Sequence, residues 1–133
     1  TYSLGLSLGT GPATKYAALT DATGLLLVMP YDTLANVAKD SYPWLPVQTL
    51  LTNNVRTTKF MADYGGKVAI IVGADDNLIK PERSKALAAH AKNLVAYEKI
   101  PGKTHTSMIG SQALKNWLNK TFEQMHTSFK KNE

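Results

Sequence analysis

The stretch Gly5-Leu6-Ser7-Leu8-Gly9 decides how this sequence is interpreted, because it lies between a short apolar run and a helical pattern. The run covers residues 2–6, and a helix is expected over 12–19, with Pro12 near its first turn. A G-x-S-x-G pentapeptide between strand and helix is typical of a nucleophile elbow, a sharp turn that lifts a serine hydroxyl above a sheet edge. Side chains at both flanking positions should clash in such a turn, so both positions require glycine. The pattern alone is weak and fits a plain glycine turn equally well.

Three further apolar runs follow this turn. They cover residues 25–29, 67–72 and, more weakly, 94–100, and each stops at proline or glycine. Continuous apolar runs are typical of parallel strands buried on both faces and joined by helices. Helices are expected over 81–92 and at the C-terminus, where an amphipathic stripe recurs at helical spacing: Leu114, Trp117, Leu118, Thr121, Phe122, Met125 and Phe129. The sequence therefore predicts an α/β fold, a parallel sheet with helices on both faces.

The segment 31–66 has a different character. It contains Tyr42-Pro43-Trp44-Leu45-Pro46 with short apolar pieces on either side. The two prolines exclude a long helix there. We expect one to three short helices over the carboxyl edge of the sheet, a small lid-like insertion within a single domain spanning residues 1–133.

A nucleophilic serine needs a general base and an acid that orients it. Loops after two later strands supply these residue types in the order Ser, Asp, His: Gly73-Ala74-Asp75-Asp76-Asn77 and Pro101-Gly102-Lys103-Thr104-His105. This agreement favours the elbow over a plain glycine turn. The residues alone leave open which of the two aspartates faces His105. The backbone N–H of Leu8 follows the serine and is the expected oxyanion donor.

The other titratable residues have simpler interpretations. His90 is expected inside a helix and His126 beside the apolar stripe, both as surface or boundary side chains. Asp32 is expected to cap the turn Tyr31-Asp32-Thr33. No second histidine or carboxylate stands near His105 at metal-ligand spacing, so a metal site is not expected. Nucleophilic catalysis by a serine, a histidine and an aspartate needs no cofactor, so none is expected.

Composition sets outer limits on the function. The chain has 133 residues, 44% hydrophobic and 19% charged, with no cysteine. These values exclude a disordered tail, a collagen-like repeat and a disulfide framework, and predict one domain or part of one. The net charge of +5 comes from dispersed lysines, which favours a solvated surface over a nucleic-acid site. No apolar run approaches the roughly 20 residues of a membrane-spanning helix.

The sequence resembles the C-terminal half of an α/β-hydrolase, in particular the small-lidded serine hydrolases of the ABHD type and their bacterial relatives. The stretches that carry the resemblance are 5–11, 30–34, 42–47, 73–76 and 101–105, in the family's order. The resemblance implies the last four strands of that fold, Ser7 as nucleophile, His105 as base and Leu8 as oxyanion donor. It places the acid three residues after the glycine that ends the strand, which selects Asp76. Lys80 stands where relatives often have proline, a change expected to alter the loop only slightly.

The implied function is a serine hydrolase that cleaves an ester, thioester or amide through an acyl-enzyme, with a peptidase or acyltransferase as variants on the same residues. Its substrate is a small or acylated molecule, and an apolar acyl pocket is expected around Tyr31, Tyr42, Trp44, Leu45 and Val47, with core packing of Trp44 an equal alternative. The rival from another class is a non-catalytic half-domain that associates through its exposed sheet edge.

The resemblance also implies several strands before the elbow, which this sequence does not contain. We therefore expect a partial domain whose partner is the N-terminal half or a second copy. Alone it should be oligomeric or partly folded, with weak or no esterase activity. The chain does not begin with Met, so a targeting segment upstream is an open question, as is a cytoplasmic or periplasmic location.

Overall fold

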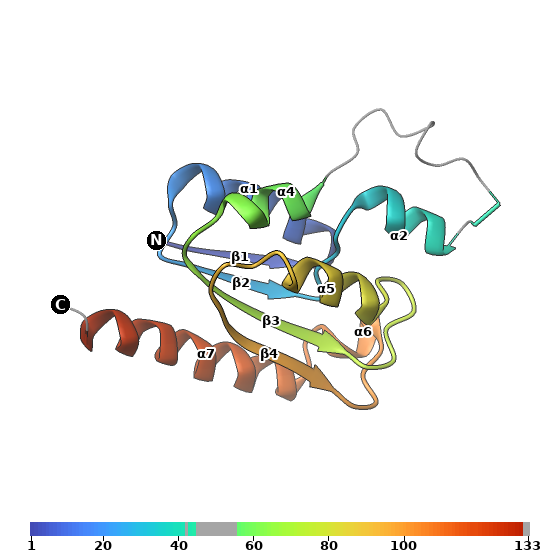
Figure 1. The fold of residues 1–133 in the computed structure, drawn as a ribbon. Helices are drawn as coiled ribbons and strands as arrows, with labels where there is room; N and C mark the ends of the chain where they lie inside the picture. Colours follow the sequence, from blue (N-terminus) through green and yellow to red (C-terminus); the bar gives the residue numbers. More distant parts are fainter. Residues whose placement is uncertain (42, 45–55, 132–133) are drawn as a thin grey trace.

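The computed structural model describes residues 1–41, 43–44 and 56–131, with side chains described as far as residue 126. Its centre is a parallel sheet of four strands in the order β1-β2-β3-β4 (Figure 1). The strands are β1 (Tyr2–Leu6), β2 (Gly24–Val28), β3 (Lys67–Gly73) and β4 (Leu94–Ile100). The predicted fold class is confirmed, and each strand lies within one or two residues of its predicted range.

Helices connect these strands and cover the sheet. They are η1 (Ser7–Gly9, a 3₁₀ turn), α1 (Thr10–Thr20), α2 (Leu34–Ser41), α4 (Thr57–Asp63), α5 (Pro81–Ala88), α6 (His105–Met108) and α7 (Gln112–Lys131). Figure 1 shows α1, α4 and α5 on one face and the long α7 across the other. Each connection between neighbouring parallel strands therefore passes through helix, as parallel pairing requires.

The apolar run of β2 divides between two cores because successive side chains in a strand point to opposite faces. Leu25 and Leu27 join a cluster with residues of α1, α4 and α5. Leu26 and Val28 join a second cluster that includes Leu114 and Trp117 of α7. The predicted burial of this strand on both faces is confirmed.

Three expectations about the helices and the last strand need correction. β4 forms an edge of the sheet, and its Val95 is 48% exposed rather than buried. Phe122 is 46% exposed although it lies on the predicted apolar stripe, and its ring contacts that of Tyr2, the first residue of β1. The helix expected over 81–92 ends at Ala88, where the chain tightens into i→i−3 turns such as His90 N–H to the Leu87 carbonyl.

The two ends of the insertion between β2 and β3 contact each other. Thr33 and Arg56 form an isolated antiparallel bridge, and the Thr58 amide donates to the Asp32 carbonyl oxygen at 3.3 Å. Within the described residues the insertion contributes α2 and α4, which is consistent with the short helices expected there. No described helix combines the length and the apolar character that crossing a bilayer requires.

Candidate active site

Ser7 lies in a strained turn directly after β1. Its φ angle is +54°, in the left-handed region that residues other than glycine rarely adopt. The threonine that opens α1 holds this turn: the Thr10 hydroxyl donates to the Ser7 carbonyl oxygen at 2.7 Å, and the Thr10 backbone N–H also donates to it. Strain of this kind is found at functional sites when the surrounding structure fixes it.

Of the two glycines that flank Ser7, only Gly5 lies where neighbouring atoms leave no room for a side chain. A Cβ on Gly5 would lie 2.7 Å from the Ala13 Cβ and 2.8 Å from the Thr10 Cα, so the close approach of strand and helix excludes a side chain. A Cβ on Gly9 would meet nothing within 4 Å. The expectation that both positions need glycine for steric reasons is wrong for Gly9, because that position faces open space.

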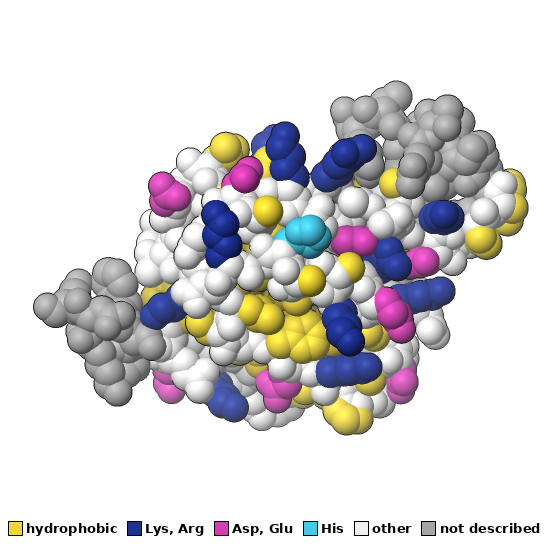
Figure 2. Space-filling view, viewed as in Figure 1, with side chains coloured by type: hydrophobic (Ala, Val, Ile, Leu, Met, Phe, Trp, Pro, Cys, Tyr) yellow, Lys and Arg dark blue, Asp and Glu magenta, His cyan; other side chains and the backbone are white. Residues whose placement is uncertain are grey.

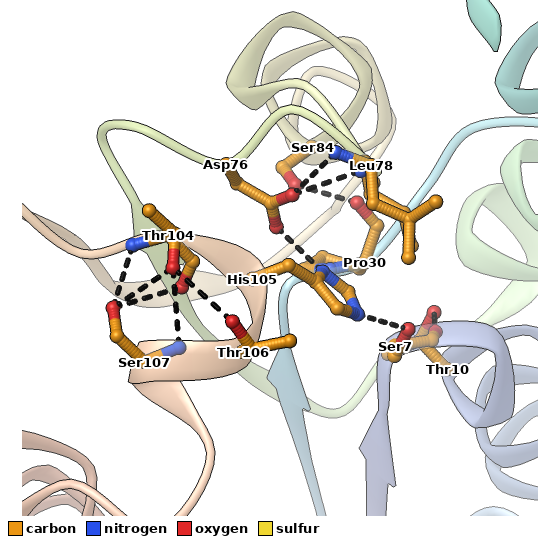
Figure 3. Close-up of polar contacts among 11 residues, drawn as sticks. Ser7, Thr10, Pro30, Asp76, Leu78, Ser84, Thr104, His105, Thr106 and Ser107 are labelled. Carbon is orange, nitrogen blue, oxygen red and sulfur yellow. Dashed lines mark hydrogen bonds and ion pairs between the residues drawn. The ribbon is translucent and has the colours of Figure 1, made fainter.

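Hydrogen bonds connect Ser7, His105 and Asp76 in one chain (Figure 3). The Ser7 Oγ and the His105 Nε2 are 2.8 Å apart, and the His105 Nδ1 and the Asp76 Oδ2 are also 2.8 Å apart. The side chain of His105 is 12% exposed and that of Asp76 1%. The imidazole is therefore oriented by a buried carboxylate on one side and faces the serine hydroxyl on the other.

The loop after β3 presents Asp76, not Asp75, to the imidazole. The second carboxylate oxygen of Asp76 accepts the backbone N–H groups of Leu78 at 2.9 Å and Ile79 at 3.0 Å. Asp75 is exposed. The two amides fix the Asp76 carboxylate and leave its other oxygen for the Nδ1–H of His105.

His105 is positioned by the helix that it begins. Thr104 is the N-cap of α6, and it forms a capping box with Ser107 in which each side chain accepts the other's backbone N–H. Figure 3 shows this pair beside His105. A single helical turn would fray without such a cap, so the Thr104–Ser107 pair holds the backbone from which the imidazole projects.

The sequence is similar to two proteins of undescribed function. No known protein-family profile matches the chain. Two uncharacterized proteins of Mycobacterium tuberculosis, MT2364 and Rv2307c, are each 32% identical to it over 101 residues. That alignment covers 76% of this chain and 36% of each relative, so the chain spans about a third of the length of these relatives.

Solved structures align with a larger share of this chain than the two sequence relatives do. The metagenomic α/β-hydrolase MGS-MChE2 superposes with a TM-score of 0.69 at 18% identity, over 93% of this chain and 61% of that one. The chain has a partial α/β-hydrolase fold. Est1E of Butyrivibrio proteoclasticus, in a complex with ferulic acid, gives a TM-score of 0.73 at 16% identity, over 95% and 59% of the two chains. The monoacylglycerol lipase of Paleococcus ferrophilus gives 0.64 at 16%, over 93% and 67%. At these identities the likeness concerns the fold alone.

Within this α/β-hydrolase fold, the turn after Ser7 carries the expected oxyanion donor. The backbone N–H of Leu8 lies in the first turn of η1, where amides have no partner within the helix. The Leu8 carbonyl oxygen accepts the hydroxyl of Tyr31 at 3.2 Å. A tyrosine hydroxyl is protonated at neutral pH, and burial raises the pKa of Tyr31 further above its ordinary value, so the group stays available as a donor. Tyr31 thus contacts the turn backbone from the next strand's loop.

The expected acyl pocket is described only in part. Tyr31 is 1% exposed and Trp44 is 77% exposed. Core packing of Trp44 is therefore wrong, because its ring lies at the surface. Tyr42, Leu45 and Val47 fall outside the described residues, so their role in a pocket stays a prediction.

The remaining sequence expectations concern residues near the site. His90 follows α5 and is exposed, and the exposed His126 stacks on Phe122. Asp32 does cap its turn, since its Oδ1 accepts the Thr33 N–H at 2.8 Å. Its other oxygen contacts Arg83, 51 positions away, and no local pattern in the sequence indicates that contact.

Proposed function

We propose that the protein is a serine hydrolase of the small-lidded ABHD type, acting on an acyl ester or thioester. The observation that carries the proposal is the unbroken chain of hydrogen bonds from Ser7 through His105 to Asp76. The same groups serve as nucleophile, general base and orienting acid in serine hydrolases of unrelated folds.

The proposed reaction has two halves. In the first, the Ser7 Oγ attacks the acyl carbon while the His105 Nε2 accepts its proton, and the Leu8 N–H donates to the developing oxyanion. The C–O or C–S bond to the leaving group then breaks, and His105 returns the proton to the leaving group. In the second half, water attacks the acyl-enzyme with His105 again as base, which releases the acid and regenerates Ser7. Asp76 remains ionised and stabilises the imidazolium.

This chemistry uses side chains and backbone alone and calls for no cofactor. Esters are expected to react more readily than amides, because an alkoxide is a better leaving group than an amide anion. A peptidase or an acyltransferase would use the same three residues and differ only in the leaving group or the acceptor.

Two measurements on the protein test the proposal. A fluorophosphonate probe should label the wild-type protein, and p-nitrophenyl acetate should be hydrolysed. Ser7→Ala should abolish labelling and turnover. Ser41→Ala, at an exposed serine at the end of α2, should change neither. A folded wild-type protein without label and turnover would contradict the proposal.

A second candidate function is association through the outer edge of β1. It is supported by two leucines on β1, Leu4 and Leu6, which are 50% and 41% exposed. A groove of about 390 Å³ lies beside them between β1 and α7, lined by Tyr2, Leu4, Leu26, Leu118, Asn119, Phe122 and Glu123. Unpaired strand edges with apolar neighbours recruit further strands. The added strand would come from an upstream part of the protein or from a second copy.

Sedimentation velocity distinguishes these cases. If β1 binds a second copy, residues 1–133 should sediment as a dimer or larger species, and Leu4→Lys should shift them toward monomer. If an upstream segment covers β1, the longer protein should be monomeric and Leu4→Lys should destabilise it. A monodisperse, fully active monomer of residues 1–133 would contradict both.

A further inference from the structure

Arg83 on α5 contacts two carboxylates, one just before α2 and one in the last turn of α2. Its Nη1 donates to the Asp32 Oδ2 at 3.0 Å, and its Nε lies 3.4 Å from the Asp40 Oδ2. Asp32 lies two positions before α2, and Asp40 lies in the last turn of that helix. One guanidinium therefore contacts the first helix of the insertion near both ends.

The contacts of Arg83 are partly shielded from water. The exposed fractions of the side chains are 26% for Arg83, 9% for Asp32 and 22% for Asp40. Asn36, inside α2, donates to the same Asp32 Oδ2 at 2.9 Å. Charge-assisted hydrogen bonds are about twice as strong as neutral ones, and burial reduces their screening. The contact between Arg83 and Asp32 is thus better protected than an ordinary surface ion pair.

The next residue on α5 continues this attachment. The Ser84 hydroxyl donates to the Pro30 carbonyl oxygen in a buried hydrogen bond. Pro30 follows Met29, which ends the β2 run at a left-handed φ of +53°. Two successive side chains of α5 therefore hold the segment between β2 and α2, and this segment leaves the sheet through a strained residue.

The segment between β2 and α2 contacts both the turn of Ser7 and the loop that carries Asp76. Tyr31 contacts the turn of Ser7 through the Leu8 carbonyl oxygen. It also belongs to a small buried cluster with Val37 of α2 and Ile79. Ile79 donates its amide to Asp76. In Figure 1, α2 lies beyond the carboxyl end of β2, on the side of the sheet where the loops of Ser7, Asp76 and His105 also emerge.

We propose that Arg83 is a positioning residue that holds α2 against α5, and that it thereby sets the space available to the acyl group above Ser7. This proposal rests on the proposed hydrolase function and adds the residue that governs chain-length preference. Arg83 does not touch the reacting atoms. It acts on α2 through Asp32 and Asp40.

An arginine suits this role better than a lysine. The planar guanidinium presents several N–H donors in a fixed fork, so that different nitrogens reach different carboxylates. Here the Nη1 donates a hydrogen bond to Asp32, and the Nε lies at ion-pair distance from Asp40 without hydrogen bonding to it. A single ammonium group on a flexible stem would satisfy one carboxylate at a time. Arg83→Lys should therefore restore only part of what Arg83→Gln loses.

The kinetic test compares Arg83→Gln and Arg83→Lys with Lys85→Gln in the intact protein. Lys85 is an exposed cation on the same helix, so its substitution controls for charge and helix propensity. With p-nitrophenyl octanoate, Arg83→Gln should raise KM about five- to tenfold, the loss expected for a charge-assisted contact. With the acetate, its kcat should change less than about twofold, because the hydrogen bonds to His105 are intact. Arg83→Lys should lie between, and Lys85→Gln should match wild type.

A second measurement does not depend on turnover. Amide hydrogen exchange across residues 34–41 should accelerate in Arg83→Gln and not in Lys85→Gln, because α2 loses its attachment. Asp40→Asn should give a smaller acceleration, because it removes only one of the two Arg83 contacts. Adding it to Arg83→Gln should produce little further change, because Arg83→Gln already removes the contact with Asp40.

Each outcome has a definite meaning. Unchanged exchange over α2 in Arg83→Gln overturns the positioning role. A uniform fall in kcat for all chain lengths, or a KM effect equal to that of Lys85→Gln, overturns the specificity role. Absence of hydrolysis and of fluorophosphonate labelling in the folded wild type overturns the proposed function instead, and the exchange result still decides whether Arg83 holds α2.

Discussion

Gly73 and Lys103 approach so closely that a side chain at residue 73 is excluded: a Cβ there would lie 2.5 Å from the Lys103 carbonyl oxygen. The loops that follow β3 and β4 meet at this point. Two backbone hydrogen bonds reinforce the contact, from the Ala74 N–H to the Ile100 carbonyl and from the Asp75 N–H to the Lys103 carbonyl, each 3.0 Å long. The distance between Asp76 and His105 is therefore fixed by their backbones.

Gly73→Ala should push these two loops apart and weaken the contact between Asp76 and His105. Displacing a catalytic group by about 1 Å can cost up to about 10²-fold in rate, so we expect kcat for p-nitrophenyl acetate to fall at least tenfold. Gly65→Ala is the matched control, because a Cβ there meets nothing within 4 Å. Equal activities of the two variants would show that the loops tolerate the separation.

The two glycines of the Ser7 turn should respond differently to alanine. Gly5→Ala inserts a methyl group against Ala13 and Thr10, and overpacking of this kind costs about 1–3 kcal/mol of unfolding free energy. Gly9→Ala adds a methyl group in open space and should be neutral or slightly stabilising. Urea unfolding of the two variants measures both values. A larger loss for Gly9→Ala would contradict the packing described for this turn.

Asp76→Asn should leave the fold intact and lower kcat by about 10⁴-fold. The uncharged amide favours the wrong tautomer of the His105 imidazole and cannot stabilise the imidazolium that forms during the reaction. Asp75→Asn should change kcat by less than about threefold, since this exposed side chain does not face His105. Steady-state kinetics of both variants, with circular dichroism as a check of folding, separate the two residues. The reverse ranking would assign the orienting role to Asp75.

Much of this arrangement could be predicted from the sequence. The G-x-S-x-G turn, the apolar runs and the glycine or proline that ends each run follow local rules, and parallel strands bring the residues after their carboxyl ends to one edge. For the same reason the order Ser, Asp, His indicated that Ser7, His105 and one of the two aspartates after β3 could meet.

Other features depend on tertiary contacts without a local signal. Nothing near Arg83 in the sequence indicates Asp32, and nothing near Gly9 distinguishes its open surroundings from the crowded ones of Gly5. The exposure of β4 follows from its place at a sheet edge, which its apolar residues do not reveal. The sequence pattern alone does not decide between Asp75 and Asp76 as the partner of His105. The decision rests on the family resemblance, or on the structure, where the amides of Leu78 and Ile79 fix the Asp76 carboxylate.

Tyr31→Phe should reduce turnover while leaving the triad geometry in place. The variant loses the hydrogen bond to the Leu8 carbonyl oxygen, and a typical bond of this kind contributes about 0.5–1.5 kcal/mol, or roughly two- to tenfold in kcat if it holds the turn. Tyr16→Phe, at a tyrosine that is 51% exposed, is the control. Identical kcat values for the two variants would limit Tyr31 to a packing role.

Tyr64 should make stability fall at alkaline pH. Burial, followed by the negative charge of Asp21, raises its pKa from 10.0 to about 12, and its hydroxyl donates to the Ala22 carbonyl oxygen. A pKa raised by folding gives a contribution that is complete below pH 10 and is lost as the pH approaches 12. The stability difference between wild type and Tyr64→Phe should therefore shrink over this interval in urea titrations. A constant difference would contradict the assignment.

The positions of Ser7 and His105 have a consequence for folding. They follow β1 and β4, the outermost strands of the described sheet, and are 98 positions apart. Contacts between residues so far apart in the sequence form slowly, because the entropy of closing a long loop is lost before the contact contributes any stabilising free energy. The appearance of turnover during refolding should thus mark the moment when all four strands have come into register. Until then Ser7 remains an ordinary alcohol, so a chain still emerging from the ribosome would carry no reactive nucleophile.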